Sequence, residues 1–146
     1  MKKLLFIFLF VTLAGIIKSF ASDNKLVNTL YFDEGLILYE QKKFDKAKFK
    51  FEQDIVYNPK SEKSYLYLSK IFNEQKKIEL EEKNLSTVIL LNPKNEEAIY
   101  NLAKLKLKKS DFLESKNLID QLLTFCIDYC QKSNQLKIEI EKSLKK

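Results

Sequence analysis

The stretch from residue 28 to residue 95 constrains the fold most, because it contains one pattern written twice. Pro59 and Pro93 close the two copies and lie 34 residues apart (93 − 59). In the first copy Ala47 and Phe51 follow Phe44 at i+3 and i+7, which is the spacing of one helix face. A β-strand, whose side chains alternate between two faces, would not use this spacing. The pattern therefore predicts helices of fixed length in series.

Six positions of the first copy carry a resemblance to a known family. Gly35 falls where two helices must pack closely, and Phe51 falls where a large side chain must fill a gap. The set that resembles the tetratricopeptide repeat signature is Gly35, Leu38, Phe44, Ala47, Phe51 and Pro59. Glu34 and Asp54 stand where that family usually has Leu or Ala. We expect this charge to lie on the uncovered flank of a first repeat.

The resemblance implies an all-α fold, an α-solenoid of antiparallel helix pairs that forms a right-handed superhelix of tetratricopeptide type. About three repeats and a C-terminal capping helix are expected, because each repeat buries its apolar flank only against a neighbour. The expected organisation is a signal peptide at 1–21, a lead-in at 22–27, repeats at 28–61, 62–95 and 96–129, and the capping helix at 130–146.

Local signals place the turns and caps of these pairs. The dipeptides Lys42-Lys43 and Lys76-Lys77 are expected to form the turns within the first two pairs, and Ser61 is a predicted N-cap. Glu81 replaces the small residue that Ala47 supplies in the first copy, which predicts looser packing at that crossing.

The third pair is predicted from its caps. Asn95 is expected to cap one helix, and Asp111 with Glu114 fits a capping box that opens the next, in which Ser115 is the small residue. No proline follows this helix, so it is expected to run on through Cys130. The last helix is predicted to bury a stripe of Leu136, Ile140 and Leu144.

The N-terminus has the pattern of a secretory signal peptide. Lys2 and Lys3 precede an apolar run from Leu4 to Ile17, and Ser19 with Ala21 forms an A-x-A-like cleavage site. A helix of about 14 residues spans about 21 Å, short of the roughly 30 Å hydrocarbon core. We therefore expect cleavage and an exported protein of the periplasm or cell envelope. The alternative is an uncleaved N-terminal membrane anchor.

Composition argues against an enzyme and against nucleic acid. The chain has no histidine, on which general acid and base catalysis and most metal sites depend. The carboxylate pairs Glu81-Glu82 and Glu96-Glu97 are adjacent in sequence, so their side chains point about 100° apart on a helix. No catalytic residue, cofactor or metal is predicted. The net charge of +6 falls to +3 without Lys2, Lys3 and Lys18, which is too small and too interleaved for a nucleic-acid partner. At most weak contact with a membrane surface is expected.

The two cysteines leave two alternatives open. An even pair in an exported chain suggests a disulfide. Cys126 and Cys130 are four residues apart, however, so on one helix their Cβ atoms would lie about 5–6 Å apart, against about 3.8 Å in a disulfide. A bridge would need the helix to break between them. We favour two small apolar residues that face the closing helix.

The resemblance also implies where a partner would bind, because the first helix of each pair lines the concave face in this family. The corresponding residues are Phe32, Leu36, Tyr39, Lys63, Leu66, Lys70, Asn73, Tyr100, Lys104 and Lys108. An apolar end and a lysine-lined end suit a peptide with a hydrophobic residue and a carboxylate. The bland alternative is that the lysines form a solvated face and the aromatic rings partly bury one another.

The sequence thus predicts a non-catalytic protein-protein interaction module of the cell envelope, which binds a peptide or protein segment in the concave groove and is monomeric unless bound. The arginine and asparagine set of family members that clamp C-terminal carboxylates is missing, so that activity is not carried over. The second hypothesis is a structural subunit that stacks through its repeat flanks, against which the charge of Glu34 and Asp54 argues.

Overall fold

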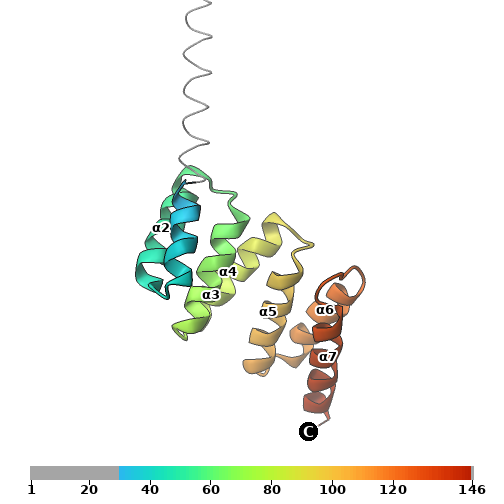
Figure 1. Ribbon diagram of the computed structural model, residues 1–146. Helices are drawn as coiled ribbons and strands as arrows, with labels where there is room; N and C mark the ends of the chain where they lie inside the picture. Colours follow the sequence, from blue (N-terminus) through green and yellow to red (C-terminus); the bar gives the residue numbers. More distant parts are fainter. Residues whose placement is uncertain (1–29, 146) are drawn as a thin grey trace, which may run out of the picture. The chain divides into compact units, whose positions relative to one another are not determined.

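The computed structural model describes residues 30–145, and the chain divides after Pro59 into two compact units. The predicted signal peptide and lead-in lie outside the described residues. Unit 1 contains one helix pair, a helix over residues 30–40 and α2 (Phe44–Tyr57). Unit 2 contains α3 (Glu62–Glu74), α4 (Ile78–Leu91), α5 (Glu96–Lys108), α6 (Phe112–Leu123) and α7 (Cys130–Leu144). All regular structure in residues 30–145 is helical (Figure 1).

Each helix of unit 2 packs against the next along the chain, from α3 to α7 (Figure 1). Their apolar faces form one cluster whose members from α4, α5, α6 and α7 include Leu85, Ile99, Ile119 and Ile140, all fully buried. The short turns within the pairs α3–α4 and α5–α6 make the partners antiparallel. The predicted capping helix is present as α7, which covers α6 and also contacts α5.

The turns within the three pairs repeat with the 34-residue period. Lys42, Lys76 and Ser110 each have a positive φ of 56–62°. In each turn this residue and the next donate backbone hydrogen bonds to carbonyls of the preceding helix, for example from Lys76 to Asn73 and from Lys77 to Phe72. This is the Schellman arrangement, normally built around glycine. The predicted lysine turns are confirmed, and their left-handed residue is a lysine.

Three of the six signature residues, Gly35, Ala47 and Phe51, are buried between helices as predicted, whereas Leu38 and Phe44 are partly exposed and Pro59 is exposed. Gly35 is buried, and the equivalent Ser69 and Ala103 are at most 2% exposed. The small positions Ala47 and Ser115 and the large positions Phe51, Leu85 and Ile119 are fully buried. Ser115 also donates a hydrogen bond to the Ala103 carbonyl at 2.8 Å, which ties α6 to α5.

The predicted caps differ in outcome. Asn95 caps α5, since its side chain accepts from the Ala98 amide at 2.8 Å. Asp111 accepts from the Glu114 amide at 3.3 Å, but its own amide donates to the Lys106 carbonyl, so the capping box is only half formed. Ser61 precedes α3 without capping it, because its hydroxyl donates to the Ser64 hydroxyl instead.

Two placements predicted from the sequence are wrong. Asp54 does not lie on an uncovered flank, because it is only 2% exposed. Leu144 is 50% exposed, whereas Leu136 and Ile140 are buried as predicted. Leu144 is the last residue of α7, where the helix has passed beyond the cluster that buries the other two.

The helix expected to run through Cys130 ends at Leu123 instead, and α7 begins at Cys130. The break has a physical cause in Glu96 of α5, whose carboxylate accepts from the backbone amides of Ile127, Asp128 and Tyr129 at 2.7–3.0 Å. These three donors would otherwise need partners at the start of α7. Glu96 therefore stabilises a loop in place of a continuous helix.

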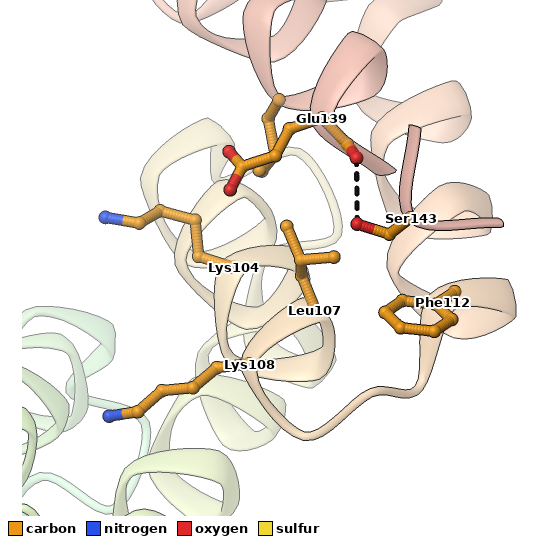
Figure 2. A pocket seen from close by; sticks show the side chains of 7 residues that line it. Lys104, Leu107, Lys108, Phe112, Glu139 and Ser143 are labelled. Carbon is orange, nitrogen blue, oxygen red and sulfur yellow. Dashed lines mark hydrogen bonds between the residues drawn. The ribbon is translucent and has the colours of Figure 1, made fainter. Parts of the chain in front are cut away.

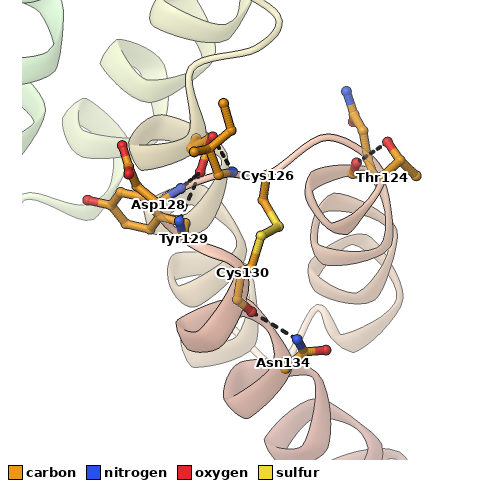
Figure 3. Close-up of a disulfide and its surroundings, with 9 residues drawn as sticks. Thr124, Cys126, Asp128, Tyr129, Cys130 and Asn134 are labelled. Atoms are coloured by element: carbon orange, nitrogen blue, oxygen red, sulfur yellow. Dashed lines mark hydrogen bonds between the residues drawn. A yellow bond between two sulfur atoms is a disulfide. The ribbon is translucent and has the colours of Figure 1, made fainter.

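Cys126 and Cys130 form a disulfide across this loop, with Cα atoms 5.3 Å apart (Figure 3). The preference for free thiols was therefore wrong. The condition stated for a disulfide, a helix broken between the two residues, is met in the structure.

Candidate functional site

The predicted binding residues of unit 1 are half-buried and largely serve the packing of their own helix pair. The ring centroid of Phe32 lies 5.7 Å from that of Phe51, and the centroid of Tyr39 lies 5.6 Å from that of Phe44. Leu36 lies beside them on the same helix and is also partly exposed. In unit 1 the rings thus partly bury one another.

In unit 2, α3 and α5 are joined by an ion pair on the predicted face. Lys70 of α3 lies 2.8 Å from a carboxylate oxygen of Glu97 of α5, and its ammonium also lies 4.6 Å from the centre of the Tyr67 ring. Leu66 packs against the core cluster, and Lys63 at the start of α3 is exposed. The charge of Lys70 is therefore largely balanced by Glu97.

A buried carboxylate lies next to three of the predicted residues. Glu81 of α4 is 6% exposed, and its carboxylate accepts from the Asn73 side chain at 2.9 Å. Burial raises the pKa of Glu81, while the Asn73 bond and the cations Lys108 and Lys104 offset part of this rise. The expected loss of packing at this crossing did not occur, because Glu81 is held by a polar partner instead of leaving a gap.

The α5 residues of the predicted set form a cation and aromatic surface with the start of α7. The Lys104 ammonium lies 5.7 Å from the centre of the Tyr100 ring, and that ring lies 5.4 Å from the ring of Tyr129. Lys132 covers the Tyr129 ring from 4.8 Å. Desolvation, with a contribution from the Glu139 carboxylate, raises the pKa of Tyr100. Desolvation also raises the pKa of Tyr129, with smaller contributions from nearby carboxylates. Both rings therefore carry a neutral hydroxyl at neutral pH.

A pocket of about 420 Å³ opens between α5, α6 and α7 (Figure 2). It is lined by Lys104, Leu107, Lys108, Phe112, Leu136, Glu139 and Ser143. Figure 2 shows Lys104 and Lys108 extending from α5 in the same direction, with Glu139 of α7 facing Lys104. The Ser143 hydroxyl donates a hydrogen bond to the Glu139 backbone carbonyl one turn earlier on α7, at 3.0 Å. The pocket thus combines apolar side chains with two lysines and the Glu139 carboxylate.

Sequence reasoning missed the contributions of α6 and α7 to this pocket. Phe112 begins α6, and Leu136 and Glu139 are on α7, which was treated only as a cap. The available signal was Leu107, which follows Lys104 by three residues and so shares its face of α5. Glu81 and Glu97 were missed as charge partners because both were considered only as members of adjacent carboxylate pairs.

Those two carboxylate pairs diverge, as predicted. Glu81 bonds to Asn73, whereas Glu82 forms ion pairs with Lys106 and Lys109. In the other pair, Glu96 accepts from the 127–129 backbone and Glu97 pairs with Lys70. Neither pair converges on one point at which a substrate atom could sit.

Over residues 30–145 the helices are too short or too polar to cross a bilayer. Within the same residues, no cluster of three histidine, cysteine or acidic side chains is arranged to hold a metal ion.

Comparison with known proteins gives likenesses in structure alone, since neither a family model nor a curated protein matches the chain. The tetratricopeptide domain of Arabidopsis OM64 superposes with a TM-score of 0.73 at 16% identity, over 82% of this chain and 98% of that one. The first such domain of Spaghetti (RPAP3), bound to the HSP90 peptide SRMEEVD, gives 0.74 at 14% identity, over 82% and 94%.

A bacterial chaperone also superposes on the chain, with a slightly lower TM-score. The Yersinia enterocolitica type III secretion chaperone SycD, in complex with a peptide of the translocator YopD, gives a TM-score of 0.69 at 14% identity, over 79% of this chain and 90% of that one. The described helices therefore have the fold of tetratricopeptide repeat proteins, with α7 as the closing helix.

Proposed function

We propose that the chain is a non-catalytic protein-protein interaction module of the cell envelope, which binds a peptide or protein segment along the α3 and α5 face of unit 2 and into the pocket where α5 meets α6 and α7. The observation that carries the proposal is the pocket between α5, α6 and α7, in which apolar side chains lie beside two exposed lysines and one exposed carboxylate, Glu139. Pockets with apolar walls and a few polar groups are the usual form of a recognition site.

The pocket chemistry indicates what the bound segment contains. Leu107, Phe112 and Leu136 can surround one apolar side chain of the ligand. Lys104 and Lys108 would then lie beside an acidic residue of the same segment. The two lysines outnumber the one carboxylate of the pocket, Glu139, so the net charge of the rim is positive and would favour acidic over basic ligands.

The solved structures of similar fold support a peptide as the ligand. RPAP3 and SycD are each described with a bound peptide, from HSP90 and from YopD respectively. The divergent carboxylate pairs support a non-catalytic role. The envelope setting is supported by the basic and apolar pattern of residues 1–21.

Peptide display tests the binding face. We expect a library selected on the purified protein to be enriched in peptides that combine one large apolar residue with a neighbouring Asp or Glu. The double variant Lys104→Glu/Lys108→Glu should bind the selected peptides about tenfold more weakly or worse, because each reversal adds repulsion at the rim.

The matched control reverses two exposed lysines outside the pocket, Lys83 on α4 and Lys94 in the α4–α5 turn. Lys83→Glu/Lys94→Glu changes the net charge by the same amount and should leave affinity within about twofold. Equal losses in both double variants would mean that only net charge matters. Selected peptides that bind Lys104→Glu/Lys108→Glu at full affinity would contradict the proposal.

Export has a separate test. The protein recovered from the native cell is expected to begin at Ser22, as judged from its intact mass, and to fractionate with the envelope. Recovery with residues 1–21 intact would favour the anchored alternative.

A further inference from the structure

Unit 1 exposes a surface built mostly from positions whose equivalents in unit 2 are buried. We call this surface the open flank, defined by Leu30, Glu34, Ile37, Lys50 and Tyr57. Leu30, Glu34 and Ile37 follow one another at i, i+4 and i+7 on the first helix, and Lys50 and Tyr57 are seven residues apart on α2, so each set shares a helix face. Leu30, Ile37 and Tyr57 are 54%, 55% and 49% exposed.

The 34-residue period shows what these positions do elsewhere. Ile37 corresponds to Ile71 and Leu105, which are 0% and 3% exposed, and Leu30 corresponds to the fully buried Ser64 and Ala98. Leu105 and Ala98 belong to the same buried cluster as Leu85 and Val88 of α4. The positions are therefore helix-packing positions, which in unit 1 carry apolar side chains without a cover from the described residues.

The charges of the open flank are arranged so that the surface complements itself. Glu34 on the first helix pairs with Lys50 on α2, and the Lys50 ammonium also lies 5.2 Å from the centre of the Tyr31 ring. A two-fold rotation about an axis through the middle of the flank places the first helix of one copy over α2 of the other. Glu34 of each copy then faces Lys50 of its partner, and the apolar residues meet around them.

At the opposite end of the repeat series, α7 covers α6 and buries Leu136 and Ile140. The exposed positions of α7 are mostly polar, among them Gln131, Lys132 and Gln135, with Ile138 and Leu144 as the apolar exceptions. Head-to-tail stacking would need a matching apolar surface at both ends. We infer that the open flank pairs with the open flank of a second copy, giving a closed, two-fold symmetric dimer.

This inference differs from the monomer expected from the sequence, and the structure removes both grounds for that expectation. Asp54 is buried and so presents no charge to a second copy, and Glu34 is paired with Lys50. The inference does not depend on the peptide site of unit 2.

Sedimentation velocity tests the dimer. The sample is the protein purified after expression of the full chain. The wild type is expected to be dimeric at micromolar concentrations. Glu34→Lys and Lys50→Glu should each raise the dimer dissociation constant about tenfold or more, because each variant places like charges across the two-fold axis twice. A monomeric wild type at the highest soluble concentration would overturn the inference.

Mixing the two single variants gives the sharpest test. Glu34→Lys carries only lysines at the two positions and Lys50→Glu only glutamates, so each should be monomeric alone and the equimolar mixture should form a heterodimer. No other occupant of the flank predicts this rescue. A mixture that stays monomeric, or variants that dimerise as the wild type does, would contradict the inference.

The matched control reverses charges on the opposite face of α2, where Lys48 and Glu52 pair at 2.8 Å. Lys48→Glu and Glu52→Lys should keep the wild-type dimer, and their mixture should show no additional association. Circular dichroism on all four variants checks folding, which the loss of one surface ion pair is expected to leave intact.

Discussion

Gly35 is the residue at which the first helix pair tolerates least change. A Cβ atom there would lie 2.7 Å from Cε1 and 2.8 Å from Cδ1 of the fully buried Phe51 ring. Overpacking of this kind costs about 1–3 kcal/mol, against a gain of about 1 kcal/mol in helix propensity for alanine. We expect Gly35→Ala to lower the free energy of unfolding by about 1 kcal/mol, measured by urea denaturation.

The control for Gly35→Ala is Asp33→Ala, two residues away on the exposed side of the same helix. It should not destabilise the protein. The double variant Gly35→Ala/Phe51→Leu should recover part of the Gly35→Ala loss, since leucine can move away from the new methyl group. A Gly35→Ala protein as stable as the wild type would show that the helices do not pack as closely as described.

Glu81 makes the stability of unit 2 depend on pH. Because burial raises its folded-state pKa, the folded protein holds this proton more tightly than the unfolded chain does. Stability from this group is therefore present at low pH and falls as pH rises from the ordinary carboxyl value through the raised folded value. Glu81→Gln removes the titrating group, so the stability of this variant relative to the wild type should increase as pH rises through that window.

Thermal denaturation of the wild type and Glu81→Gln across this pH range measures the difference. Asn73→Ala should increase the total loss of stability with rising pH relative to the wild type. The Asn73 hydrogen bond lowers the pKa of Glu81, so its loss lets that pKa rise further. Parallel melting temperatures for wild type and Glu81→Gln at all pH values would count against this account of Glu81.

For single residues, the sequence predicted burial correctly where a residue type has one packing role. Gly35, Ala47 and Phe51 are predictable because the 34-residue spacing fixes their neighbours. Glu81 was not, because its partner Asn73 becomes visible only when α3 and α4 are placed side by side. Asp54 was misplaced for a similar reason, since its position in the pattern does not say which side of α2 is covered.

The turns between paired helices carry a strained residue that can be relieved. Lys76 has φ of 56°, a conformation that costs an L-residue about 1–2 kcal/mol and costs glycine nothing. We expect Lys76→Gly to raise the free energy of unfolding by about 0.5–1 kcal/mol in urea denaturation.

The adjacent Lys77 has φ of −92° and supplies the matched control. Lys77→Gly should lower stability, since glycine there only adds freedom to the unfolded chain. If both substitutions destabilise to the same degree, the left-handed turn is not the conformation in solution.

The loop between α6 and α7 depends on Glu96, which lies on a different element. Desolvation acts to raise its pKa, but the amides of Ile127, Asp128 and Tyr129 together hold the pKa of Glu96 below its usual value. The stabilising contribution is thus present above the ordinary carboxyl pKa and lost as pH falls through the lower folded value. Glu96→Gln should speed hydrogen exchange at residues 127–129.

Hydrogen exchange monitored by mass spectrometry compares Glu96→Gln with Glu97→Gln. Glu97 is in the same turn of α5 but pairs with Lys70 of α3, so its loss should leave residues 127–129 protected. Equal protection in wild type and Glu96→Gln would contradict the capping role. The comparison is made with the Cys126–Cys130 disulfide intact, so that only the carboxylate changes.

At the element scale the helices were predictable and their exceptions were not. Periodicity and caps place α3 to α5 close to their observed bounds, because the residues that signal a start or an end are local. The end of α6 at Leu123 was missed because the acceptor that stabilises the loop is about 31 residues earlier in the chain, at Glu96. The disulfide was misjudged for the same reason, since its geometry depends on that break.

For the whole molecule, the sequence predicted which residues share a helix face but not which helices share a pocket. Lys104 and Lys108 were placed on α5 correctly, while Phe112 and Glu139 entered the site only once α6 and α7 were seen beside it. Burial of the closing helix against α6 follows from Leu136 and Ile140. The pocket forms where α7 packs beside α5 and α6, and its shape depends on the side chains there. A pattern of apolar positions does not contain that information.

We propose that the chain holds a partner on the α3 and α5 face of unit 2, and site-specific photo-crosslinking in the native cell tests this binding most directly. A photoreactive residue is placed at Asn73 or Lys104 on that face, and at Lys83 of α4 or Asn117 of α6 as exposed controls. The account predicts that the same partner is captured from Asn73 and Lys104 and from neither control. Capture from α4 or α6 with none from Asn73 and Lys104 would contradict it.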